Sequence, residues 1–148
     1  MRKKNYRRKK RGPVVSKKVT VDGIKFASGL EAYMYRALKK AKIKAQYEKR
    51  SFELQPSFEL KNSSYERQSN GKGDMIDRGN KKVLSINYTP DFEGTNFIIE
   101  CKGRANESFP LRWKLFKKVI ADNYPKVRLF KPQKQNECDE VVKLIKHG

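Results

Sequence analysis

The sequence contains few of the residues on which common enzyme sites depend. Histidine occurs once, at His147, and cysteine occurs only at Cys101 and Cys138. A Ser-His-Asp triad or another histidine-based acid–base scheme would therefore rest on a residue at the end of the chain. The two cysteines lack C-x-x-C spacing, so neither a zinc site nor a disulfide scaffold is expected. Carboxylates and lysines are left as the candidates for chemistry.

Long apolar runs are also missing. Only 36% of the 148 residues are hydrophobic, and no apolar run approaches the length of a membrane span. No apolar segment follows the basic amino end as in a secretory signal, so we expect a cytoplasmic protein. The length favours one domain with a modest core.

Acidic residues are scarce relative to basic ones. Sixteen Asp and Glu face 36 Lys and Arg, which gives a formal net charge of +20. Such an excess predicts a polyanionic partner, and nucleic acid fits best. An anionic membrane is the competing partner, but the basic segments lack the apolar face that membrane binding requires.

Residues 1–17 are strongly basic and contain no acidic residue. Because such a block repels itself, we predict a disordered arm, followed by a single domain over residues 18–148. The arm would contact DNA phosphates, the alternative being a solubilising or targeting tail. The predicted contacts in the arm are Arg2, Lys3, Lys4, Arg7, Arg8, Lys9, Lys10 and Arg11.

The first half of the domain shows clear local signals. Residues 18–26 have Asp-Gly between alternating residues, which predicts a β-hairpin. Ser28 is a good N-cap for a helix that runs to about Lys42, and Glu31 completes a capping-box pattern. Glu31 falls at the edge of the apolar stripe, so it either closes the cap or reaches inward to a site. A strand is expected over residues 45–54.

The second half alternates further strands and helices. Residues 61–80 are polar without sustained periodicity, which predicts a mobile insertion that either contacts substrate or is a tolerated surface loop. The order predicts an α/β fold in which helices flank a sheet. The remaining predicted elements are strands at 57–60, 82–89, 96–102 and 126–131, and helices at 108–123 and 136–146.

Three charged residues near the centre of the chain form the candidate site. In a strand over residues 96–102, Glu100 and Lys102 share one face. Asp91 precedes a turn, so a hairpin would bring its carboxylate beside Glu100. Carboxylate oxygens are the ligands that Mg²⁺ prefers, and a nearby lysine can orient a water or stabilise a phosphate oxygen. The plain alternative is an ordinary turn and an exposed strand face.

A second basic surface is predicted close to this site. One face of the helix over residues 108–123 is rich in Lys and Arg, and Arg104 precedes it. These side chains either hold a DNA backbone or simply face solvent. The predicted contacts are Arg104, Arg112, Lys114, Lys117 and Lys118.

Three short motifs occur in an order that is similar to a known family. They are Ser28-Gly-Leu-Glu31, Tyr-Thr-Pro-Asp91-Phe and Glu100-Cys-Lys102-Gly103. Together they resemble the motifs of the PD-(D/E)xK nuclease superfamily, most closely phage endonuclease I-type Holliday junction resolvases. Segments 21–26 and 54–60 are also similar to small phage and prophage proteins of an uncharacterised family allied to these nucleases. The resemblance covers roughly residues 18–131.

The resemblance implies a restriction-endonuclease-like fold, in which helices flank a central mixed β-sheet. It implies that Asp91, Glu100 and the carbonyl of Cys101 bind Mg²⁺, with Mn²⁺ as a substitute, and that Glu31 completes the acidic site. Lys102 would assist the attacking water. It also implies a homodimer on branched DNA, in the bacterial host cytoplasm if a phage encodes the chain. The insertion at 61–80 is longer than usual in that family, so the dimer geometry is expected to differ.

The residues and the resemblance together predict a metal-dependent, structure-selective endodeoxyribonuclease that hydrolyses phosphodiester bonds. Its preference for Holliday junctions is implied by the resemblance alone. Within the enzyme class, the alternative is a nicking or repair endonuclease on linear duplex DNA. Outside it, the alternative is a non-catalytic basic nucleic-acid-binding protein, which would explain the charge without any site.

Overall fold

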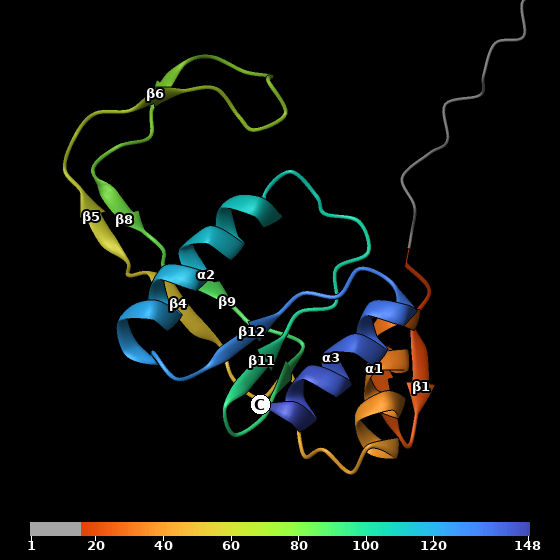
Figure 1. Cartoon of the computed structure of the whole chain (residues 1–148). Coiled ribbons are helices and arrows are strands. Elements are labelled where there is room, and N and C mark those ends of the chain that lie inside the picture. Colours follow the sequence, from red (N-terminus) through yellow and green to blue (C-terminus); the bar gives the residue numbers. More distant parts are fainter. Residues whose placement is uncertain (1–15) are drawn as a thin grey trace, which may run out of the picture.

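The computed structural model describes residues 16–148, which form three helices and several small β-sheets (Figure 1). The mixed α/β class expected from the sequence is confirmed. The predicted DNA contacts Arg2 to Arg11 lie outside the described residues. Within residues 16–148 no helix is both long and apolar enough to cross a membrane. The helices are α1 (Gly29–Lys40), α2 (Phe109–Asn123) and α3 (Gln135–His147).

The predicted amino-terminal hairpin is present. β1 (Val19–Val21) pairs antiparallel with β2 (Ile24–Phe26). The two turn residues, Asp22 and Gly23, have φ values of 51° and 79°. A two-residue hairpin turn needs positive φ at both positions, which Asp-Gly supplies at low cost. The hairpin places Phe26 in the core, where it is fully buried.

Helix α1 begins where the capping signal predicts. The Ser28 hydroxyl accepts a hydrogen bond from the Glu31 amide at 3.2 Å. The buried face consists of Glu31, Ala32, Met34 and Leu38, whereas Leu30 is only partly buried. The predicted apolar stripe consists of Leu30, Met34, Ala37, Leu38 and Ala41. The face that is buried in the structure is rotated from this stripe towards Glu31.

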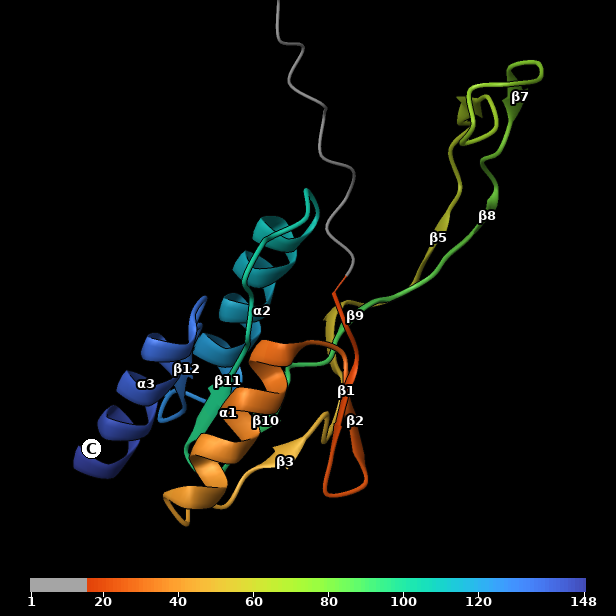
Figure 2. The same ribbon diagram turned by 90° about the vertical axis from the view of Figure 1, so that its right-hand side faces the viewer.

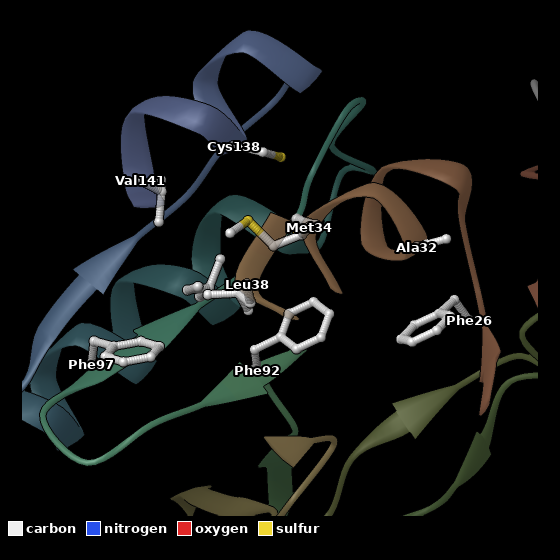
Figure 3. Packing of buried hydrophobic residues seen from close by; sticks show 10 residues of the cluster. Phe26, Ala32, Met34, Leu38, Phe92, Phe97, Cys138 and Val141 are labelled. Atoms are coloured by element: carbon white, nitrogen blue, oxygen red, sulfur yellow. The ribbon is translucent and has the colours of Figure 1, made fainter. Parts of the chain in front are cut away.

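The central sheet has the strand order β12-β11-β10-β3. β11 (Phe97–Ile99) runs antiparallel to β10 (Phe92–Glu93) and parallel to β12 (Arg128–Phe130), and β3 (Gln46–Tyr47) pairs with β10. The side chains of β11 alternate as predicted. Its two ends face the core cluster that contains α1 and α3, shown in Figure 3, and its central Ile98 faces the cluster that contains α2.

The second core cluster fixes α2 to the other face of the sheet. The helix buries Phe109, Trp113, Phe116 and Ile120. Their partners from the strands are Phe52, Tyr88 and Ile98. The helix starts at the predicted place, but Ser108 makes no side-chain cap, and the Asn106 side chain instead accepts from the Phe109 amide at 2.9 Å.

Two strands predicted as continuous are each divided. Residues 45–54 form β3 and, in a different sheet, β4 (Phe52–Gln55). Glu48 has a φ of 45°, and its amide donates to the Asp91 carbonyl at 2.8 Å, so the chain turns between the two strands. Residues 82–89 likewise divide into β8 (Lys81–Val83) and β9 (Ile86–Tyr88). The hairpin partner of β11 is therefore β10, rather than the predicted strand 82–89.

The polar segment predicted as an irregular loop contains a β-ribbon. β4 pairs with β9, β5 (Phe58–Leu60) with β8, and β6 (Tyr65–Glu66) with β7 (Ile76–Asp77), all antiparallel. The β5–β8 and β6–β7 pairs extend away from the rest of the molecule, whereas β4 and β9 pack against α2 (Figures 1 and 2). We refer to residues 56–85 as the hairpin arm.

Candidate active site

The sheet register brings Asp91 beside Glu100. Asp91 directly precedes β10 and Glu100 directly follows β11, and Phe92 pairs with Ile99 in the antiparallel register. The Asp91 Oδ2 accepts a hydrogen bond from the Cys101 amide at 2.6 Å. The predicted proximity of the two carboxyl groups is thus confirmed, although a different strand supplies the hairpin.

A cavity of about 440 Å³ is lined by all four of the predicted catalytic residues, Glu31, Asp91, Glu100 and Lys102. The acidic residues come from three segments of the chain, since Glu31 belongs to the first turn of α1. The rotation of the α1 stripe turns Glu31 towards the sheet, and it is only 6% exposed.

Burial makes the two neighbouring carboxyl groups hard to ionise together. The pKa of Asp91 is raised to about 8, first by burial and then by the nearby charges of Glu100 and Glu31. Burial also raises the pKa of Glu100. Glu100 Oε2 is fully buried without a hydrogen bond of normal geometry, and the neighbouring Tyr88 hydroxyl partly offsets the effect of burial by lowering the pKa of Glu100. A bound cation would relieve both the repulsion and the missing hydrogen bond.

Glu31 differs from the other two acids because its oxygens are already engaged. Oε2 accepts from the Tyr47 hydroxyl at 2.6 Å and from the Ala27 amide at 3.0 Å. Oε1 accepts from the Ser28 hydroxyl at 2.8 Å. In this arrangement Glu31 closes the start of α1 and also lines the cavity, so both sequence interpretations describe part of its role.

Lys102 lies against an aromatic ring at the edge of the cavity. Its Nζ is 4.8 Å from the centre of the Phe109 ring, an attractive cation–π arrangement. Its charge lowers the pKa of Asp91, which partly offsets the effect of burial and of the neighbouring acids. Lys102 is therefore close enough to influence the carboxyl groups while α2 holds its side chain.

A divalent cation fits two of the predicted ligands. Asp91 and Glu100 supply adjacent carboxylates, and the unpartnered Glu100 oxygen is the kind of buried atom that a cation satisfies. Between residues 16 and 148, no group of three or more His, Cys, Asp or Glu side chains has the geometry of a metal site. Metal binding through any of the predicted ligands, Asp91, Glu100, Glu31 and the Cys101 carbonyl, stays a prediction.

The predicted basic contacts differ in their distance from the cavity. Arg112 lines it, and its guanidinium donates to the Asn87 carbonyl and lies 5.9 Å from the Tyr88 ring centre. Arg104 lines an adjoining hollow that shares Glu31 and Lys102. The others, Lys114, Lys117 and Lys118, are exposed along α2 outside the cavity lining, and Lys118 pairs with Asp122.

Tyrosines that sequence reasoning did not assign belong to this site. Tyr88 is 6% exposed and lines the cavity, and its hydroxyl hydrogen-bonds to no described residue. Tyr47 holds Glu31 from the end of β3. Tyr88 stands directly before the Thr-Pro-Asp motif, a position that could have drawn attention to it. Nothing in the sequence links Tyr47 to a glutamate sixteen residues earlier.

Comparison with known proteins places the chain in one family. The chain belongs to the family described as protein of unknown function (DUF1064), whose profile matches residues 11–137. The match includes all four cavity residues and the whole hairpin arm. Searches of curated proteins and of solved structures found no significant match.

Proposed function

We propose that this protein is a divalent-metal-dependent endodeoxyribonuclease that cuts branched DNA, with Asp91, Glu100 and Lys102 as catalytic residues and Glu31 as their acidic neighbour. The observation that carries the proposal is the convergence of these side chains on one cavity in a chain of net charge +20. The repulsion between the buried carboxylates favours binding of a cation between them. The net positive charge of the chain favours a polyanionic partner such as DNA.

Each residue has a distinct role in the proposed reaction. When bound, Mg²⁺ neutralises the scissile phosphate and lowers the pKa of a water. Asp91 and Glu100 hold the cation through carboxylate oxygens, and Lys102 orients the attacking water and stabilises charge on the phosphate. Arg112, at the cavity wall, contacts the DNA backbone. Water adds to phosphorus as the P–O bond to the leaving strand breaks, without a covalent intermediate.

The proposal includes the finer fold assignment. A four-stranded mixed sheet with α1 and α3 on one face and α2 on the other is compatible with the restriction-endonuclease-like arrangement. Mn²⁺ is expected to replace Mg²⁺ because both accept oxygen ligands. We also propose a homodimer, because resolving a junction requires two cuts, and a cytoplasmic site of action.

The alternative is a nucleic-acid-binding protein without catalysis. The hydrogen bonds that engage Glu31 favour it, since both carboxylate oxygens of Glu31 already accept from neighbouring donors. This alternative gives no functional reason for placing the carboxyl groups of Asp91 and Glu100 close enough to repel each other.

A cleavage assay separates these functions. The full chain is incubated with a labelled four-way junction or a linear duplex of the same length, in Mg²⁺ or in EDTA. Variants Asp91→Asn and Glu100→Gln remove cation ligands with little change in volume, and Glu140→Gln, at an exposed position of α3 away from the cavity, is the matched control.

The nuclease proposal predicts cutting in Mg²⁺ but not in EDTA, loss of cutting in the two cavity variants with DNA binding retained, and a control that behaves as wild type. Preference for the linear duplex would identify the nicking enzyme. Binding without cutting in either Mg²⁺ or Mn²⁺ would leave the non-catalytic protein.

A further inference from the structure

The hairpin arm contributes nothing to the cores. None of residues 56–85 is buried, and none belongs to either core cluster. Two-stranded ribbons are only marginally stable in water, and yet this one extends well beyond the body of the molecule (Figure 2). The hairpin arm therefore does not serve the stability of the fold, and we expect its role to lie in binding.

The outer part of the arm is held by its own polar groups. Asp77 Oδ1 accepts from the amides of Ser64 at 2.9 Å and Gly79 at 2.8 Å, and the Arg78 amide donates to the Ser64 carbonyl at 2.7 Å. A Cβ atom on Gly79 would collide with the Asn62 carbonyl, so this crossing requires glycine. The arm therefore presents its side chains from a defined backbone.

Large apolar side chains are concentrated on the arm. Of the eight exposed large hydrophobic residues in the described chain, five lie within it. Their exposed fractions range from 47% to 75%, so they are open to a partner. The five are Phe58, Tyr65, Met75, Ile76 and Leu84.

Apolar side chains occupy both faces of the outer ribbon. Tyr65 pairs with Asp77, and Glu66 pairs with Ile76. Directly opposed residues share a face and successive residues alternate, so Tyr65 and Ile76 point to opposite sides of the ribbon. A flat protein surface would cover only one of these faces. A wedge between two stacked layers would use both.

The arm is continuous with the candidate active site. Asn87 and Tyr88, in the strand that returns from the arm, line the cavity, as does Ser51 just before β4. Tyr65 follows Gln55 by ten positions, and a fully extended chain of that length would reach at most about 33 Å, close to one turn of duplex DNA. Between these ends the arm carries Lys61, Lys81 and Lys82, all exposed and able to contact phosphates.

We propose that the hairpin arm recognises the branch point of a DNA substrate. Tyr65, Met75 and Ile76 enter the gap where base stacking is interrupted, while Lys61, Lys81 and Lys82 hold the flanking phosphates. The inference rests on the proposed nuclease function, because it assumes that the scissile phosphate lies in the cavity at the root of the arm. It assigns selectivity for branched DNA to a part of the chain separate from the carboxylates.

The test uses the full chain with Tyr65, Met75 and Ile76 all replaced by alanine. Leu144→Ala is the matched control, because Leu144 is 56% exposed on α3, outside the arm. Binding is measured to a four-way junction and to a linear duplex, each containing 2-aminopurine, which is placed at the branch in the junction. The fluorescence of this base rises when its neighbours unstack. Binding is measured in the Asp91→Asn background, so that cutting does not interfere.

The triple variant should lose about tenfold in preference for the junction, together with the fluorescence increase, and should bind linear duplex within about twofold of the parent protein. The Leu144 control should match the parent. Unchanged preference and fluorescence would overturn the proposal. So would a triple variant whose oligomer dissociates in light scattering, because the arm would then be a protein interface. If the preference for the junction depends on the hairpin arm but the wild-type protein never cuts DNA, the result would support branch recognition by the arm and contradict the proposed nuclease function.

Discussion

At the residue scale, the proposed chemistry rests mainly on Asp91 and Glu100. Their adjacency could be predicted, because a Pro-Asp before a turn and an alternating strand leave few ways to pair the segments. The engagement of Glu31 could not be predicted. A helical wheel gives the direction of a side chain, but it does not reveal that the Tyr47 hydroxyl and the Ala27 amide both donate to Oε2 of Glu31.

The raised pKa of Asp91 predicts a characteristic pH dependence of stability. Its folded value of about 8 exceeds the ordinary value of 3.8, so the folded protein holds a proton that the unfolded chain releases. Without divalent cations, the free energy of unfolding should fall as pH rises from about 4 to about 8 and then level off. Asp91→Asn should flatten this decline. Urea unfolding in EDTA at pH 5.5, 7 and 8.5 measures the effect.

Asp122→Asn serves as the control for that experiment, since Asp122 lies on the exposed surface of α2. Adding Mg²⁺ should raise stability more at pH 8 than at pH 5.5, because the cation competes with the proton for the same oxygens. If the free energy of unfolding changes equally with pH in wild type and in Asp91→Asn, the assigned shift in the pKa of Asp91 would be contradicted.

Tyr47→Phe tests the engagement of Glu31. The change removes the 2.6 Å hydrogen bond to a buried carboxylate but keeps the ring, and should lower the free energy of unfolding by about 2 kcal/mol. Tyr35→Phe is the matched control, because the Tyr35 hydroxyl donates to Asp22 at the surface, and it should cost less than about 0.5 kcal/mol. Similar losses for both variants would show that Glu31 does not depend on Tyr47.

At the element scale, the helices and their starts were predictable and the strands less so. Capping signals and apolar periodicity place all three helices within two residues of their observed bounds at each end. The division of residues 45–54 was not predictable, because it depends on a positive φ at Glu48, which carries no turn signature. The inner strands of the hairpin arm were predicted at 57–60 and from residue 82. The outer ribbon of β6 and β7 was missed because its polar sequence has no period and it is held by side-chain bonds such as those of Asp77.

Gly79→Ala should disturb the arm without disturbing the cores. The added Cβ collides with the Asn62 carbonyl, so trypsin should cleave after Arg67 and Lys72 about tenfold faster, while the thermal midpoint changes little. Gly29→Ala, at a position where a Cβ meets nothing, is the control and should leave the digestion rate unchanged. Unchanged digestion of Gly79→Ala would mean that the crossing at residue 79 does not hold the arm.

At the scale of the whole molecule, charge and geometry support the same function. Two core clusters pack three helices on opposite faces of one small sheet, and a cavity lined in part by α1 and α2 gathers acids within a strongly basic chain. The net charge follows from the composition, and the mixed α/β class follows from the order of the predicted helices and strands. The place of the arm relative to the cavity required the structure, because strand pairing over long separations fixes it.

The basic amino-terminal segment is expected to supply salt-dependent affinity. Removing residues 1–12 eliminates eight Lys or Arg residues, so DNA binding should weaken and the slope of log K against log salt should flatten by up to about seven. A version with the same residues in scrambled order keeps the charge and should retain the slope. A deletion that leaves the slope unchanged would refute a phosphate-binding role.

The central claim is that Asp91 and Glu100 bind the cation that drives strand cleavage. The most direct test is the single-turnover rate of four-way junction cleavage as Mg²⁺ is titrated, for wild type and Glu100→Gln. The account predicts a rate that saturates with Mg²⁺ in wild type and falls by at least about 100-fold in the variant, with the junction still bound. Equal rates in the two proteins, or no cleavage by wild type at any Mg²⁺ concentration, would contradict it.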